Sequence, residues 1–344
     1  AVAGETNGTR KILRTAVDVT THNDDAAAHG LTVYPAESYG VISSTSAVSH
    51  LAIQAAIDAA HAAGGGTVLL PAGTILLGES INPKSGVTLA GVAPKVTPTS
   101  SSFDLGWVVD SGTVLSYPGG NIFDRPEVGY SDSDYLVAFS IENLGAHNFA
   151  RFFRCGSRSH VGWSGSYCRN VFLSSASEYA FDLANFQHLE FDHVKAGNVK
   201  GFLHLWCDSR AADLLPDGDF TSPGNSVFTD CYCYQNQSGT IYHGVHIENV
   251  SGTSGILGSL SFYRLQVNRF NASATTTSAV RISGVATKPH PSLTFEGIDL
   301  EGTGQYGMHM SYVVRCTVGI AGISTGGTYF PITIKGDNIT GMLV

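Results

Sequence analysis

Charged residues are scarce in this sequence, and it contains no long hydrophobic run. They make up 14% of the 344 residues, against roughly 25% in a typical globular domain. The formal net charge is −9, so the chain lacks the basic surface that attracts nucleic acid. No apolar run approaches the roughly 20 residues that a helix needs to cross a bilayer. We therefore expect neither a nucleic-acid-binding protein nor a membrane-spanning one.

Cysteine is also scarce, and the six cysteines do not have the spacing of metal ligands. Cys231 and Cys233 lie two positions apart, which puts both side chains on one face of a strand. We expect the six cysteines to be structural residues of the interior. No other metal-binding motif is present, so the sequence predicts no metal site and no cofactor.

Glycine is abundant by contrast. The sequence has 40 glycines, and Ser, Thr and Asn are frequent, whereas the helix formers Lys and Glu are few. Hydrophobic residues make up 43% of the chain, which is sufficient for a large core. This composition suits strands and turns better than helices. An all-β fold is predicted.

One helix is expected near the N-terminus. Residues 1–45 show no strong period and are interpreted as a lead-in arm. Within about 49–63, Leu51, Ala55 and Ala59 recur at four-residue spacing and predict one apolar face. Three consecutive glycines end the helix. Two runs of β-branched and aliphatic residues follow it.

These elements share a pattern that consists of a helix of the type AIQAAIDAA, then GGGTV, then PAG, and then a strand that ends in Leu-x-Gly. The matching positions are Ala52-Ile53-Gln54, Gly64 to Val68, Pro71-Ala72-Gly73 and Leu89-Ala90-Gly91. In this pattern the segment resembles the start of pectate-lyase-like proteins, which include phage tailspike depolymerases. The resemblance implies a single-stranded right-handed parallel β-helix over 46–344, with the helix as a cap on its N-terminal end. One departure is that no Asp-Gly pair precedes the helix.

Two strand patterns recur from about residue 137 onward, as coils that stack on one another require. The first is apolar-x-apolar, often followed by an acid, at 139–142, 189–192, 227–230, 260–263 and 293–296. The second usually begins with Gly or Ala, at 180–184, 201–206, 244–248, 279–283, 307–311 and 331–335. The largest excess between coils, at about 207–224, is acidic and rich in turn residues. We expect it to project from the coil as an inserted loop.

In the second pattern, each residue between two apolar ones should point outward, because side chains alternate along a strand. These outward residues are Asp182, His204, His246, Arg281, His309 and Thr333, and Arg154 precedes them. Two positions further on lie Ala184, Trp206, Glu248, Ser283, Ser311 and Lys335. Since neighbouring coils lie roughly 4.8 Å apart, these residues would form one column. The column offers a sugar polymer an aromatic face and charged groups at regular intervals; the alternative is an ordinary solvated sheet.

The column predicts a substrate groove. The candidate catalytic residues are Asp182, His204, His246, Glu248, Arg281 and His309. The candidate substrate-binding residues are Arg154, Trp206 and Lys335, with Asp208, Asp213, Asp217 and Asp219 on the inserted loop. Arg and His together suit an acidic polymer, because Arg can neutralise a uronate carboxylate while His removes the proton from the adjacent carbon, and β-elimination follows.

Hydrolysis remains open as the other chemistry. It needs two carboxyl groups, about 5 Å apart for retention or about 6.5–9.5 Å apart for inversion. Asp182 and Glu248 would lie about two coils apart, near the inverting range. A loop aspartate could serve as the second acid. The sequence does not choose between these chemistries.

A second candidate column follows the first strand pattern, with Asp192, Asp230, Tyr263 and Glu296. Asp192 and Asp230 would sit on adjacent coils, where two like charges raise one pKa and can create an acid/base pair. The alternative is that these residues end strands and bond to the backbone of turns, as Asp commonly does.

The sequence therefore predicts a polysaccharide depolymerase, extracellular or on a virion tail. The paired aspartates of polygalacturonases, the Arg-x-Pro-x-x-Arg of calcium pectate lyases and the Asp-Pro-His-Glu of alginate epimerases are missing, so the sugar is not identified. The Ca²⁺ that some lyases use stays open as a cofactor, although the sequence has no motif for it. A non-catalytic glycan-binding adhesin and a structural coil of a fibre are the alternatives. The resemblance to tailspikes suggests a homotrimer by analogy.

Overall fold

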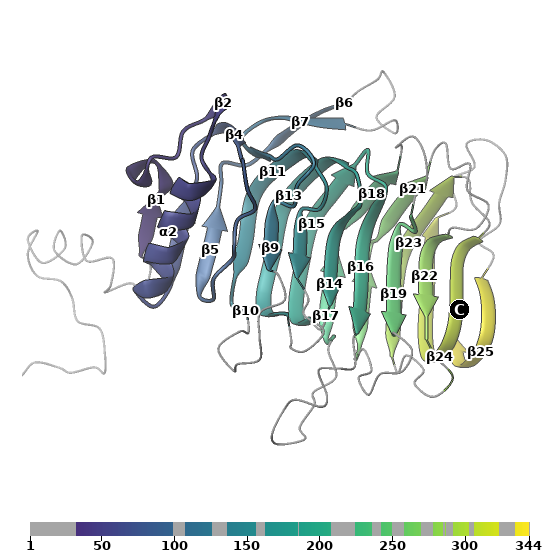
Figure 1. The fold of residues 1–344 in the computed structure, drawn as a ribbon. Coiled ribbons are helices and arrows are strands. Elements are labelled where there is room, and N and C mark those ends of the chain that lie inside the picture. The colour runs from purple at the N-terminus through teal and green to yellow at the C-terminus, as the bar shows by residue number, and fades with distance from the viewer. Residues whose placement is uncertain are drawn as a thin grey trace, which may run out of the picture.

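Strands from successive coils form one large parallel sheet, as Figure 1 shows for a computed structural model of the chain. Only β6 (Lys95–Pro98) and β7 (Trp107–Ser111) stand apart among the described strands, as an antiparallel hairpin. The predicted all-β parallel β-helix is confirmed. The structure describes residues 32–98, 107–125, 136–155, 162–184, 186–207, 224–235, 242–249, 258–269, 278–284, 286, 292–302, 306–322 and 334–343.

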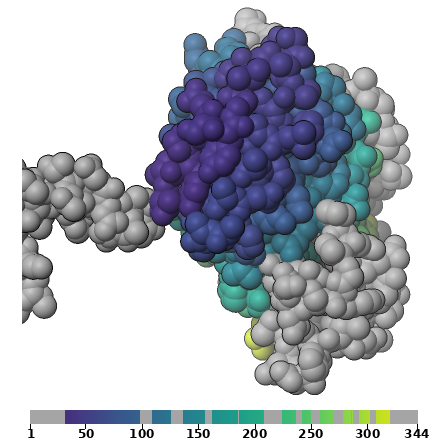
Figure 2. Space-filling model, turned by 60° about the vertical axis from the view of Figure 1, so that its left-hand side comes forward, coloured from purple at the N-terminus to yellow at the C-terminus, as the bar shows by residue number. Residues whose placement is uncertain are grey.

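Helix α2 (His50–Ala62) lies at the N-terminal end of the stack of coils (Figures 1 and 2). Its buried side chains are Ile53, Ala56, Ile57 and Ala60. They follow the i, i+3, i+4, i+7 spacing of one helix face. The apolar face predicted from the sequence was wrong in detail, because Leu51 is 73% exposed and Ala55 is exposed as well.

The coil begins earlier than the sequence indicated. Strand β1 (Val33–Pro35) pairs in parallel with β3 (Gly66–Leu69), although its residues were assigned to the lead-in arm. The 3₁₀ helix η2 (Ala36–Tyr39) and β2 (Ser44–Val48) follow. Residues 1–31 lie outside the described part of the chain. No helix among the described residues is long and apolar enough to cross a membrane.

Three stacks of strands form the wall of the coil. The first stack corresponds to the second sequence pattern and contains β9 (Phe123–Arg125), β12 (Phe153–Cys155), β14 (Tyr179–Ala184), β16 (Gly201–Cys207), β19 (Val245–Asn249), β22 (Ser278–Ser283) and the first parts of β24 (Tyr306–Gly322) and β25 (Ile334–Leu343). The second stack corresponds to the first pattern and contains β1, β3, β5 (Val87–Ala90), β17 (Ser226–Thr229), β20 (Leu260–Tyr263) and the first parts of β11 (Ser140–Phe149), β13 (Trp163–Ala176), β15 (Gln187–Gly197) and β23 (Leu293–Gly302). The short β10 (Leu136–Val137) pairs with the start of β13.

The third stack was not predicted from the sequence. It contains β2, β4 (Gly73–Leu76), β8 (Thr113–Ser116), β18 (Tyr232–Gln235), β21 (Gln266–Arg269) and the second parts of β11, β13, β15 and β23. In β11, β13, β15 and β23 it follows the second stack within one strand, with no Gly-Pro or Asn-Gly turn to mark a boundary. The two stacks therefore look like one long strand in the sequence.

The corner between these two stacks is a single residue in the left-handed conformation. It is occupied in successive coils by residues with φ from 51° to 65°, namely Asn143, Asn170, His193, Asp230, Arg264 and Gly297. Asn and Gly adopt this region at the lowest cost. The amide of Asn170 also donates a hydrogen bond to the Asn143 side chain at 2.6 Å. The corner thus forms a polar ladder along one edge of the coil.

Aromatic rings fill the interior behind the second stack. Phe191, Phe228, Phe262 and Phe295 occupy equivalent positions, and successive ring centroids lie 5.0, 4.6 and 4.9 Å apart. The six cysteines are all buried, as expected. Burial raises the pKa of the Cys155 thiol to about 12, which leaves it unreactive.

Replacing Phe228 by Ala should remove the ring that lies between those of Phe191 and Phe262. The free energy of unfolding should fall by about 3–5 kcal/mol, because the cavity is lined by rings that cannot collapse into it. Chemical denaturation measures the change. Val227→Ala serves as the matched control, since Val227 is 38% exposed, and surface changes cost about 0.5 kcal/mol or less. Equal effects of the two substitutions would contradict the packing described here.

Candidate functional site

The register between coils places the outward residues of the first stack in one column. The aligned residues in successive coils are Asp124, Arg154, Asp182, His204, His246, Arg281, His309 and Lys335. Flanking residues such as Phe181 and Leu183 are fully buried, so the residues between them point outward. Asp124 was missed, because its strand of three residues shows no apolar-x-apolar pattern.

Two further positions test the predicted register. Trp206, Glu248 and Ser283 are aligned with one another, as expected. Lys335 is not in their row, because it aligns with His309 instead. The sequence run contains two isoleucines, and Ile334 aligns with Met308, where Ile332 was expected. Lys335 therefore belongs to the main column.

His204 lies at the centre of the column between two carboxylates. Its Nδ1 is 3.0 Å from Oδ1 of Asp182, and its Nε2 is 3.3 Å from Oε2 of Glu248. The indole N–H of Trp206 donates to the same Asp182 oxygen at 3.0 Å. Arg151 Nε lies 3.2 Å from the other Asp182 oxygen. Asp182 is thus held on both of its oxygens and fixes one ring nitrogen of His204.

This arrangement sets the charges of the three groups. Burial acts to lower the pKa of His204, but hydrogen bonds with Asp182 and Glu248 outweigh it and raise that pKa to about 8. Burial acts to raise the pKa of Asp182, yet His204 brings it below its ordinary value. The hydrogen bond with His204 likewise lowers the pKa of Glu248. At neutral pH the centre therefore holds an imidazolium between two ionised carboxylates.

His246, in the next coil, is held in the neutral form. Burial and the positive charge of His204 lower its pKa to about 3. Its Nε2 lies 3.2 Å from the Ser283 hydroxyl oxygen, which accepts a hydrogen bond from Arg281 Nε at 3.0 Å. The hydroxyl hydrogen of Ser283 can therefore point at His246. Arg281 also donates to Nδ1 of His309.

Stacked rings extend the site along the axis of the coil. The ring of His204 stacks on Tyr179 with centroids 5.1 Å apart, and Tyr179 stacks on Tyr242 at 5.0 Å. On the other side, His246 stacks on His204 at 5.1 Å. Gly201 makes room for this row, because a Cβ there would lie 2.5 Å from the Tyr179 ring. The sequence patterns missed both tyrosines, since each lies outside the apolar-x-apolar core of a strand.

The remaining candidates lie at the ends of the column or beyond the described residues. Arg154 is at one end, with its Nε 3.8 Å from Asp124. At the other end only the backbone of Lys335 is described. The loop aspartates fall within 208–223, outside the described residues: Asp208, Asp213, Asp217 and Asp219.

The second candidate column lies on the second stack and is only partly aligned. Asp192, Tyr263 and Glu296 occupy equivalent positions, with Thr229 between the first two. Asp230 does not, because it is the corner residue that follows Thr229, with φ 51°. When the strands were aligned by the acidic residues that follow them, Asp230 was misplaced by one residue.

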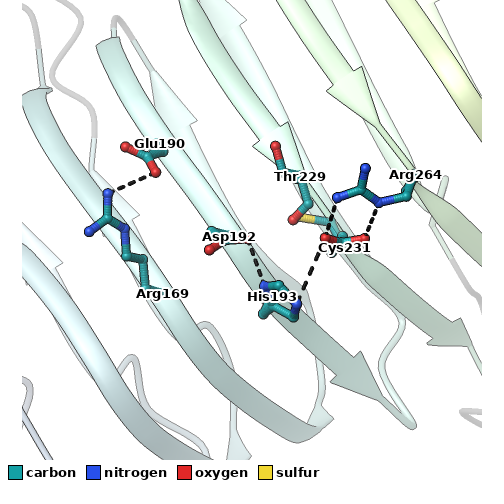
Figure 3. A network of polar contacts seen from close by, with 8 residues as sticks. Arg169, Glu190, Asp192, His193, Thr229, Cys231 and Arg264 are labelled. Carbon is teal, nitrogen blue, oxygen red and sulfur yellow. Dashed lines mark hydrogen bonds and ion pairs between the residues drawn. The ribbon is translucent and has the colours of Figure 1, made fainter.

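Asp230 is neutralised by a cation rather than by protonation. Both of its carboxylate oxygens lie 2.5 Å from the Arg264 guanidinium (Figure 3). His193 bridges to Asp192 at 2.7 Å and to Asp230 at 3.7 Å. The hydrogen bonds with Arg264 lower the pKa of Asp230. Asp230 is therefore not the acid with a raised pKa that such a pair would need.

At the low sequence identities found, comparisons with known proteins support the fold alone. No family model matches the chain, and no curated protein matches its sequence. A surface adhesin of Streptococcus pneumoniae is similar, with a TM-score of 0.52 and 12% identity over 90% of this chain and 83% of the adhesin. A protein of Geobacillus virus E2 gives a TM-score of 0.43 and 14% identity over 97% of this chain, which spans 64% of that protein's length. A tailspike of Acinetobacter baumannii bacteriophage Fri1, a capsular polysaccharide depolymerase, gives 0.32 and 14% over 90% of this chain and 63% of the tailspike.

Replacing Asp230 by Asn should reduce stability only where Asp230 is ionised. Asn tolerates the left-handed corner, so the substitution mainly removes the charge. The folded pKa of Asp230 is lowered by Arg264, so its contribution is present above the ordinary aspartate pKa of about 4 and is lost as the pH falls through the folded pKa. The melting temperature of the variant should be lower at neutral pH and approach that of the original chain in acid. A difference that persists in acid would show that the carboxylate charge is not responsible.

Proposed function

We propose that the chain binds a polysaccharide along the outward column of the first stack and cleaves it there by β-elimination. The observation that carries this proposal is the order of groups in the column, where His204 between two carboxylates is followed by His246 and then by Arg281. A base and an acid thus lie beside a guanidinium at intervals of one coil. A sugar polymer that runs along the axis would meet them in turn.

The proposed reaction begins with a uronic acid residue whose carboxylate binds Arg281. The planar guanidinium matches the geometry of the carboxylate and neutralises its negative charge. His246 takes the proton from the carbon next to the carboxyl group, and that electron pair forms a carbon–carbon double bond. The new double bond joins this carbon to its ring neighbour, whose bond to the bridging oxygen breaks, and His204 donates its proton to that departing oxygen. No water is consumed, and one product carries an unsaturated uronic acid end.

Hydrolysis is less well supported by the same groups. A glycosidase needs one carboxylic acid that keeps its proton at neutral pH, which requires a raised pKa. His204 instead lowers the pKa of both Asp182 and Glu248. The two carboxylates are therefore better suited to hold and orient His204 than to protonate a glycosidic oxygen.

Glycan binding without cleavage is the second candidate. The observation that favours it is that His204 is hydrogen-bonded to both Asp182 and Glu248 within the chain. Such bonds are typical of a rigid structural network. In that case Tyr242, whose ring stacks on Tyr179, supplies a stacking face for sugar rings. The two candidates place the ligand in the same groove and differ in whether it is cut.

The proposed substrate also bears on where the chain works. Acidic polysaccharides of cell surfaces and capsules lie outside the cell, so we place the chain in the extracellular space or on a virion tail. A homotrimer stays an expectation by analogy with tailspikes.

Replacing His246 by Ala should abolish the formation of unsaturated ends, with a loss of about 10²–10⁴-fold in rate, because the base is removed. The assay incubates the chain with a panel of acidic polysaccharides and records ultraviolet absorbance together with new reducing ends. His193→Ala is the matched control, because His193 lies at the corner of the second and third stacks. Reducing ends without absorbance would indicate hydrolysis, and binding without either signal would favour the non-catalytic candidate.

Replacing Arg281 by Gln should weaken the use of an acidic polymer by about 10- to 100-fold in kcat/KM, because a charge-assisted hydrogen bond to the carboxylate is lost. Binding of the same polymer after chemical reduction of its carboxyl groups should change much less. Arg169→Gln is the control, since Arg169 pairs with Glu190 on the second stack. Equal effects on the native and the reduced polymer would argue against a carboxylate at Arg281.

A further inference from the structure

We propose that His204, His246 and Glu248 also form a binding site for a divalent transition-metal ion such as Zn²⁺, and that the bound ion switches off cleavage. One potential ligand atom from each residue lies within 4.8 Å of the other two. Two imidazoles and one carboxylate are a common ligand set for zinc. Nitrogen ligands also make Ca²⁺ and Mg²⁺ poor occupants, since both prefer oxygen.

The separations within this cluster already approach those of a metal site. Ligand atoms about 2.0–2.1 Å from a tetrahedral zinc ion lie about 3.3 Å from one another. His204 Nε2 and Glu248 Oε2 are 3.3 Å apart. His246 stacks beside His204, in the next coil, with ring centroids 5.1 Å apart, so a small rotation brings its nitrogen to the same ion. The side chains of His204 and Glu248 are 21% and 34% exposed, so an ion can reach them from solvent.

The surroundings of His204 are organised as those of a zinc-binding histidine. Such histidines commonly bond a carboxylate through the nitrogen that does not hold the metal. Here Asp182 binds Nδ1 of His204 at 3.0 Å and is itself fixed by Trp206 and Arg151. This leaves Nε2 as the metal-facing nitrogen. Asp182 is therefore a positioning residue for the ion as well as for the imidazolium.

A second cluster of the same kind is less suited to a metal. Asp192, His193 and Asp230 also lie within 4.8 Å of one another. Arg264, however, already binds both carboxylate oxygens of Asp230 at 2.5 Å. A metal ion there would have to displace a guanidinium or sit beside it. This cluster serves as an internal comparison for the first one.

The switch follows from which atoms the ion would occupy, and this part rests on the proposed function. A metal ion on His246 blocks the lone pair that is proposed to take the substrate proton. The same ion occupies Nε2 of His204, so that nitrogen can no longer carry a proton. Binding of the ion and cleavage of the polymer therefore exclude each other.

Titration calorimetry with Zn²⁺ on the chelator-treated chain tests the site without any substrate. One ion per chain is expected, and His246→Ala or Glu248→Gln should weaken binding at least about tenfold. Asp182→Asn should weaken it about 10- to 100-fold through loss of the outer carboxylate. His193→Ala should leave binding unchanged. Binding that is absent in the original chain, that survives His246→Ala, or that is lost in His193→Ala would overturn the site.

Two further readouts keep the test decisive. Co²⁺ in place of Zn²⁺ should give the strong visible absorption of a tetrahedral nitrogen–oxygen site, and the His246→Ala chain should not, provided that its melting temperature shows that it is folded. In the cleavage assay, Zn²⁺ should inhibit over the same concentration range in which it binds. Zinc binding without any cleavage would leave the metal site standing and remove the proposed reaction. Cleavage that continues at saturating zinc would overturn the switch.

Discussion

Parallel hydrogen bonding between successive coils is the constraint on which every outward feature depends. It keeps equivalent residues roughly 4.8 Å apart and aligns His204 with His246, and His246 with Arg281. A slip of one residue in any coil would turn a charged side chain into the core. The fully buried Leu203 and Leu205 on either side of His204 oppose such a slip. The buried interior thus determines the geometry of the outward column.

This spacing is too short for like charges to stand in adjacent coils without cost, and the charges of the column are arranged accordingly. Asp182 is negative and His204 positive, and His246 gives up its proton between His204 and the guanidinium of Arg281. At the opposite corner the same rule pairs Asp230 with Arg264. A neutral imidazole beside two cations is therefore a consequence of stacking.

The strand patterns alone predicted most of the first stack, because an outward residue between two buried ones is visible in the sequence. The patterns failed where the sequence allowed two alignments of a strand with the strand of the preceding coil. Ile332 and Ile334 could each align with Met308, and the structure aligns Ile334, which moves Lys335 by two positions. Asp230 was expected in the second column, but Thr229 occupies that position and Asp230 is the left-handed corner residue after it. The rings of Tyr179 and Tyr242 meet only through the fold, so no local pattern could have placed them together.

The most direct test of the first stack as the functional face is an experimental structure of the chain with a bound acidic oligosaccharide. The sugar should lie along the outward face of β14, β16, β19 and β22, parallel to the axis of the coil, with one carboxylate at Arg281 and the adjacent carbon facing His246. A sugar bound instead over the second stack, near Asp192 and Arg264, would contradict the assignment of the first stack as the functional face.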